Sequence, residues 1–92
     1  MIGVITCECI IYDAQSLKEK RSVLKSVLTK LRQRLNVTVA ETAHQNVWQR
    51  TEIAIAAIAN DKTVVEKELQ RALKMIDGVP EIERTVTTIE WL

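Results

Sequence analysis

Two amphipathic segments, each placed between strand-like segments, limit the possible folds of this chain more than any other feature. The first spans residues 16–35, and its apolar side chains recur at helical spacing on one stripe: Leu17, Leu24, Val27, Leu28, Leu31 and Leu35. The second has its own stripe: Val65, Leu69, Ala72, Leu73 and Ile76. Each helix needs an apolar surface to cover, so the flanking strands are expected to form a sheet beneath both helices.

The ends of both helices carry start and stop signals. Ser16 can accept a free backbone N–H at the start of the first helix, and Glu19 can reach back, which makes a capping box. Residues 60–63 offer several candidate N-caps for the second helix. Gly78 is placed to be the C′ residue of that helix, and Pro80 prevents its continuation.

Four segments have the pattern of strands: residues 1–12, 37–43, 50–59 and 82–91. Residues 44–49 then form the connecting loop of a central hairpin. The order βαββαβ predicts an α+β, ferredoxin-like sandwich, in which a four-stranded antiparallel sheet of order 4-1-3-2 carries two helices on one face. A swapped or otherwise rearranged α+β sandwich is the alternative.

The size and composition fit one domain, residues 1–92. No apolar stretch approaches the length of a membrane helix, and the N-terminus has no signal-peptide pattern, so we expect a cytoplasmic protein. Cys7 and Cys9 point to the same face of one strand, and a disulfide between them would strain the backbone. We therefore expect two buried thiols. With His44 standing alone, we expect neither a metal nor a cofactor.

The first helix concentrates positive charge. It carries seven basic residues: Lys18, Lys20, Arg21, Lys25, Lys30, Arg32 and Arg34. Its only acid is Glu19, although the whole chain has a net charge of only +1. A local positive field attracts polyanions whatever the overall balance, whereas a helix face that is merely solvated normally mixes both signs. RNA contact and an ordinary soluble surface both remain possible.

The predicted topology brings the start of the first helix to the end of the second strand. Lys20 and Arg21 lie close to the apolar stripe, and a cation there needs a partner, for which Glu41 is the obvious candidate. The pair can be purely structural, or it can organise an anion site. Trp48 either caps the core at this rim or forms an exposed platform with Arg50 beside it.

No catalytic or nucleotide-binding motif is present: the sequence has no Walker loop, no GxGxxG and no HExxH. The central strands also lack the base-stacking aromatics of a standard RNA-recognition motif. An enzyme, the weakest hypothesis, would use Glu41 and His44, with Lys20 or Arg21 holding an anionic substrate in a pocket between the loops.

Three blocks of sequence resemble the YlxP-like family of small, uncharacterised bacterial proteins: residues 16–21, residues 36–41, and residues 48–50 followed by the strand 53–59. The similarity runs over nearly the whole chain. It implies a ferredoxin-like fold and, because the genes of this family often lie beside translation-initiation and ribosome-maturation genes, a role linked to translation. It implies no activity and no catalytic residues.

Two functions follow as hypotheses. The first is a non-enzymatic, RNA- or ribosome-associated module whose contact residues are Lys18, Lys20, Arg21, Lys25, Arg32, Trp48 and Arg50, with Glu41 as the structural partner at the same rim. The second is a homo-oligomeric interaction domain or small-ligand domain that uses the uncovered face of the sheet. That face would be formed by Ile2, Val4, Ala54, Ala56 and Ile58.

Overall fold

The computed structural model describes all 92 residues and contains six elements. They are β1 (Ile2–Ile11), α1 (Leu17–Arg34), β2 (Thr38–Ala43), β3 (Arg50–Ile58), α2 (Lys62–Asp77) and β4 (Ile82–Trp91). Every segment predicted from the sequence is present, and the ends of the four strands and of the first helix differ from the predictions by at most one residue.

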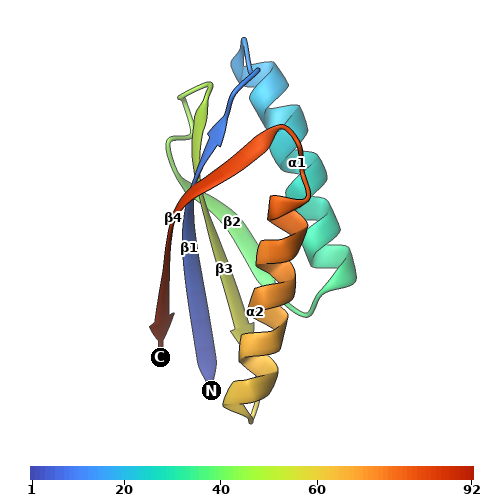
Figure 1. Ribbon diagram of the computed structural model, residues 1–92, viewed down its shortest axis with the longest axis vertical. Coiled ribbons are helices and arrows are strands. Elements are labelled where there is room, and N and C mark those ends of the chain that lie inside the picture. The colour runs from blue at the N-terminus through green and yellow to red at the C-terminus, as the bar shows by residue number, and fades with distance from the viewer.

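The four strands form one antiparallel sheet of order β2-β3-β1-β4, which is the predicted order read from the other edge. Both helices lie on the same face of this sheet, and they run in opposite directions (Figure 1). The ferredoxin-like βαββαβ sandwich is therefore confirmed. Its other face is left without a helix.

The core lies between the sheet and the two helices. Alternate residues of β1, from Ile5 to Ile11, are buried there, and the stripes of α1 and α2 pack onto them. Gly3 shows how close α2 comes to the sheet, because a Cβ at this position would lie 2.9 Å from side-chain atoms of both Leu69 and Val65. Only a residue without a side chain fits there without displacing the helix.

The helix ends follow the predicted signals with two differences. The Ser16 hydroxyl accepts the Glu19 N–H at 3.1 Å, but the Glu19 carboxylate accepts the N–H of Gln15 at 2.7 Å, one residue before the N-cap. Asp61 caps α2 by accepting the N–H of Thr63 at 2.8 Å. Gly78 is not a left-handed C′ residue: it is the C-cap with φ −80°, a conformation open to any residue.

No helix in the structure combines the length and the apolar character that crossing a bilayer requires.

Candidate nucleic-acid interface

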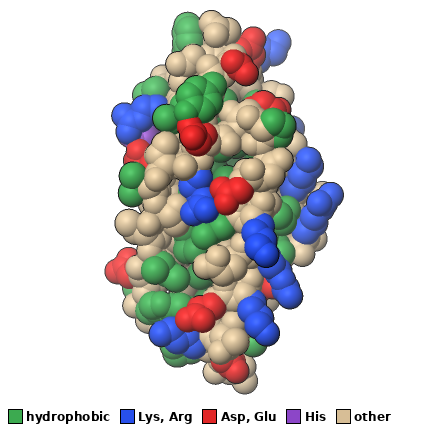
Figure 2. Space-filling view, viewed as in Figure 1, with side chains coloured by type: hydrophobic (Ala, Val, Ile, Leu, Met, Phe, Trp, Pro, Cys, Tyr) green, Lys and Arg blue, Asp and Glu red, His purple; other side chains and the backbone are tan.

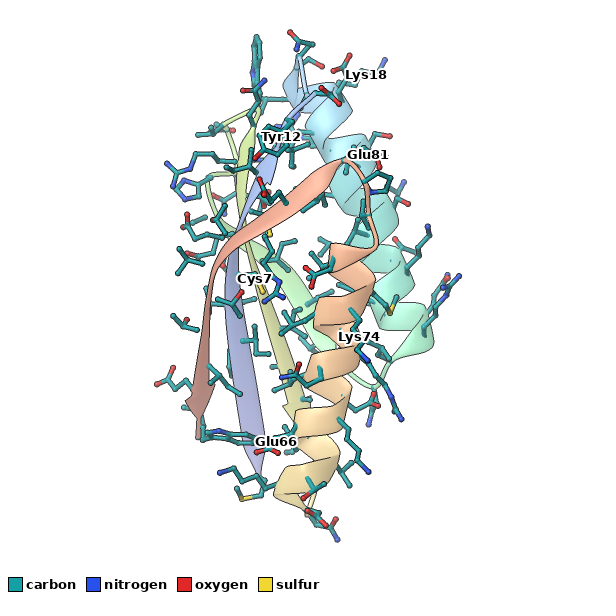
Figure 3. The ribbon with its side chains drawn as sticks, viewed as in Figure 1. Cys7, Tyr12, Lys18, Glu66, Lys74 and Glu81 are labelled. Carbon is teal, nitrogen blue, oxygen red and sulfur yellow. The ribbon has the colours of Figure 1, made fainter.

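Six of the seven basic residues of α1 are exposed, all except Lys20. None of the six forms an ion pair, since the five salt bridges of the structure involve other cations. Their one polar protein contact is from the Arg32 guanidinium, which donates to the Val39 carbonyl of β2 at 3.0 Å. Lys18 extends away from the molecule at the start of α1 (Figure 3). No carboxylate therefore lies within ion-pair distance of these six cations, and the carboxylate that shares a hollow with one of them is Glu81, opposite Lys30.

Lys20 is different, because its side chain is completely buried, with 0% exposure. Its ammonium lies 3.0 Å from Glu41 Oε2 and also donates to the carbonyl oxygen of His44. The same carboxylate oxygen accepts the Thr51 hydroxyl at 2.7 Å. The predicted Lys20–Glu41 pair is thus present, and its hydrogen bonds compensate part of the cost of burying two charges.

This burial corrects two expectations about the start of α1. Lys20 cannot be a nucleic-acid contact in this structure, because no part of its side chain reaches the surface. Arg21 was expected beside it near the buried flank of the helix, but Arg21 is exposed. The boundary between core and solvent therefore passes between these two adjacent cations.

A β-bulge in β2 accompanies the inward position of Glu41. The register between β2 and β3 pairs Glu41 with the buried Ile53, then shifts, so that Ala43 pairs with Glu52 on the uncovered face. Because side chains of a strand alternate between faces, the extra residue changes which face the end of β2 presents. Glu41 lies before the bulge and points toward Lys20 because it alternates in step with the buried Val39, so the bulge changes only the residues that follow it.

His44 begins the hairpin loop and is the only non-glycine residue with positive φ, at 64°. Its ring nitrogen Nε2 lies 3.1 Å from Glu8 Oε1, and Arg50 donates to the other Glu8 oxygen at 3.0 Å. The hydrogen bonds from His44 and, next, from Arg50 hold the pKa of Glu8 below its ordinary value. The backbone of His44 is thus tied to α1 and its ring to β1.

The other end of the loop is anchored by Gln49. Its side-chain amide donates to the backbone carbonyl oxygens of Tyr12 and Ala14 at 3.1 and 3.2 Å. The backbone carbonyl of Gln49 accepts the N–H of Ile11 at 2.9 Å. Between the two anchors lies Trp48, which is 50% exposed. Trp48 therefore does not cap the core, and the structure shows the second of the two expected arrangements, an exposed ring on a fixed loop.

Sequence reasoning missed Glu8 and Thr51 at this rim, and it singled out the block 48–50 without predicting the anchoring contacts of Gln49. Their contacts join residues from 10 to 42 positions apart, so no local spacing reveals them. Arg50, which was predicted as a surface contact, remains about half exposed while it pairs with Glu8.

The two thiols lie in the core, and the two groups of the hypothesised catalytic pair, Glu41 and His44, make separate contacts. Burial raises the pKa of Cys9 to about 12, and it raises the pKa of Cys7 too, so both stay protonated. Cys7 lies between the sheet and the helices (Figure 3). The side chain of Glu41 accepts from Thr51, the ring of His44 contacts Glu8, and the three surface hollows of the molecule are lined by other residues.

Comparisons with known proteins identify close relatives by sequence. A family model described as "Protein of unknown function (DUF503)" matches residues 2–89. The chain is 56% identical to a Bacillus subtilis (strain 168) protein, "Uncharacterized protein YlxP", over 91 residues, which covers 99% of both chains.

Solved structures share the fold at low sequence identity. A de novo designed protein with a ferredoxin fold, solved by NMR, superposes with a TM-score of 0.65 at 12% identity, covering 100% of this chain and 87% of its own. The designed protein Foldit4 superposes with a TM-score of 0.59 at 18% identity, covering 100% and 99%. A C-terminal segment of the alpha subunit of aIF2 from Pyrococcus abyssi gives 0.54 at 17% identity, covering 96% and 49%. These likenesses establish the fold and nothing more.

Proposed function

This chain belongs to the DUF503 family of proteins of unknown function, and we propose that it is a non-enzymatic RNA- or ribosome-associated module. One observation carries the proposal: α1 presents six exposed cations that form no ion pair with any carboxylate of the protein. The resemblance to the YlxP-like family, with its implied link to translation, favours RNA over other polyanions.

The cations supply affinity through the phosphate backbone. Each phosphate that a lysine or arginine neutralises releases condensed counterions, so binding weakens steeply as salt rises. Phosphate contacts position a nucleic acid but do not read its sequence, so we expect weak sequence preference.

Trp48 supplies the second part of the interface. Its exposed ring lies on a loop that Lys20 and Gln49 hold at its two ends. A base that stacks on such a ring contributes about 1–3 kcal/mol, and a fixed loop reduces the entropy lost on binding. Trp48 would thereby fix the orientation of an RNA held by α1.

A filter-binding titration against a structured RNA tests the proposal. Reversing three charges, Lys18→Glu, Lys25→Glu and Arg32→Glu, should abolish binding. Lys62→Glu serves as a control for the loss of a cation outside α1, at the start of α2, where a helix N-terminus tolerates an acid. Because this change also removes the contact of the Lys62 ammonium with the Trp91 ring, 4.9 Å from its centre, circular dichroism verifies that the variant folds. Binding by the triple variant at the wild-type affinity would contradict the proposal.

A second candidate function is self-association through the uncovered face of the sheet. In the middle of that face the register aligns small or uncharged residues across all four strands, in the row Ala40, Ala54, Thr6 and Thr88. Ile58 and Val86, on the same face, are 65% and 58% exposed. A second copy can pack there at the usual sheet-to-sheet distance of about 10 Å.

Light scattering at micromolar concentration tests this second candidate. A dimer that Ala56→Glu dissociates would support it, and a strictly monomeric wild-type protein would contradict it. Both functions are compatible, because α1 lies on the opposite face of the sheet (Figure 1).

A further inference from the structure

The outward surface of α1 has cations along both of its flanks. On the flank beside β2 lie Lys18, Arg21, Lys25 and Arg32, and the last of these touches the β2 backbone. On the other flank lie Lys30 and Arg34, four residues apart, and Lys30 borders a hollow that Glu81, in the turn that follows α2, also lines. No salt bridge joins Lys30 to Glu81. In Figure 2 lysine and arginine side chains gather over the lower part of the helix side of the molecule, and carboxylates lie over its upper part and toward its middle.

Between the two cationic flanks runs a neutral polar strip, made of Ser22, Ser26, Thr29 and Gln33. These residues follow one another at spacings of four, three and four, so they lie on one line along the helix. They line a shallow hollow on the outward face together with Lys25 and Lys30, one cation from each flank. The strip carries hydroxyl and amide groups and no charge.

From this arrangement, and resting on the proposed function, we infer that the RNA bound by α1 is double-stranded and that α1 lies in its minor groove. Two rows of cations separated by a neutral strip match two phosphate strands separated by a groove. The strip's hydroxyl and amide groups can donate to and accept from the 2′-hydroxyl groups that an A-form minor groove displays.

The dimensions of the helix layer favour this groove over those of B-form DNA. An α-helix is about 10–12 Å across with its side chains, too wide for the B-form minor groove of about 6 Å. The B-form major groove is wide enough but about 8.5 Å deep, and a helix must project to reach its floor. α1 lies in one layer with α2 and does not project in this way, whereas the A-form minor groove is shallow.

The side chains of α1 also argue against an unpaired strand on this face. Single-stranded RNA is held by aromatic side chains on which its bases stack, and α1 has no aromatic residue between Leu17 and Arg34. The exposed tryptophan, Trp48, is on the hairpin loop, where it can meet unpaired nucleotides that adjoin the duplex.

Fluorescence anisotropy with labelled nucleic acids tests the inference. The probes are a 16-base-pair RNA duplex, a length of about one and a half turns, a DNA duplex of the same sequence, and each RNA strand alone. We expect the RNA duplex to bind at least about tenfold more tightly than the DNA duplex or either strand. Equal or tighter binding of single-stranded RNA, or of the DNA duplex, overturns the inference, and single-stranded binding still upholds the proposed function. Binding to none of the probes overturns both.

Two double variants test the claim that both groove edges are contacted. Lys25→Glu with Arg32→Glu reverses two of the four cations on the flank beside β2. Lys30→Glu with Arg34→Glu reverses both cations on the other flank. Each should weaken binding of the RNA duplex at least about tenfold, and both by similar amounts. Full affinity in the Lys30/Arg34 variant, with a loss in the other, shows a one-sided contact and overturns the inference. Thermal unfolding followed by circular dichroism verifies that each variant folds.

The neutral strip gives an independent readout. Ser26→Glu with Thr29→Glu places carboxylates over the groove floor and should weaken duplex binding at least about tenfold, while Ser26→Ala with Thr29→Ala should keep most of it. An unchanged affinity of the glutamate variant means that the strip does not face the RNA, which overturns the inference.

Discussion

Lys20 and Lys25 belong to the same helix and carry the same charge, yet the structure gives them opposite roles. Lys20 has no exposed surface and shares its ammonium between Glu41 and the carbonyl of His44. Lys25 is exposed and pairs with no carboxylate. The difference arises from position on the helical wheel, because Lys20 falls within the apolar stripe and Lys25 beyond its edge. One helix thereby joins a structural anchor to a free cationic surface.

The largest expected effect comes from removing the anchor. Lys20→Met leaves Glu41, whose side chain is only 17% exposed, without its counter-charge, so we expect a loss of up to about 3–5 kcal/mol in the free energy of unfolding. Lys25→Met, the matched variant, should change that free energy by less than about 0.5 kcal/mol. Urea denaturation measures both. A small loss in Lys20→Met would show that the buried pair does not hold the fold together.

The double variant Lys20→Met with Glu41→Leu sharpens this result. Replacing both members of a buried pair by apolar residues costs less than breaking the pair, so the double variant should be more stable than Lys20→Met alone. A strictly additive loss would indicate that the two side chains do not interact.

A smaller effect is expected at Thr51, whose buried hydroxyl donates to the same carboxylate. Thr51→Val keeps the shape of the side chain but removes this hydrogen bond, and we expect a loss of about 1–3 kcal/mol in unfolding free energy. Thr38→Val is the control, since Thr38 is exposed on the neighbouring strand. Equal effects of the two changes would mean that the hydrogen bond from Thr51 to Glu41 does not contribute to the stability of the fold.

Trp48 tests the other side of the comparison, because its exposed ring should matter for binding and not for folding. Trp48→Ala should leave the midpoint of urea unfolding unchanged while weakening RNA binding by about 1–3 kcal/mol. Val47→Ala, on the same loop and 43% exposed, serves as the control. A destabilised Trp48→Ala protein would show that the ring packs on the molecule in solution.

The smallest effect is expected from the exposed pairs of Glu8. Because His44 and Arg50 lower the pKa of this carboxylate, its contribution to stability is present above the ordinary pKa of a glutamate. That contribution is lost as the pH falls through the lowered folded-state pKa. The urea concentration at the unfolding midpoint of the wild type should therefore decrease slightly as the pH is lowered below about 4.5. The Glu8→Gln variant should lack this part of the decrease. Parallel curves for both proteins would contradict the assignment.

The sequence predicted the architecture because each segment carries its own periodicity and the order of segments leaves few arrangements. It also predicted the Lys20–Glu41 pair, since a helical wheel and the strand order together place both residues at one rim. The links from His44 and Arg50 to Glu8 could not be predicted, because they depend on the register of β1 against β3 and on the positive φ of His44. Gly78 was misassigned because glycine permits a left-handed conformation without requiring it.

The salt dependence of RNA binding tests most directly the central claim that α1 is a free cationic surface. For a structured RNA, the logarithm of the association constant should fall linearly with the logarithm of the salt concentration. The slope should become markedly shallower in the variant with Lys18→Glu, Lys25→Glu and Arg32→Glu, because fewer phosphates are neutralised. Identical slopes for the variant and the wild type, or binding that is independent of salt, would contradict the claim.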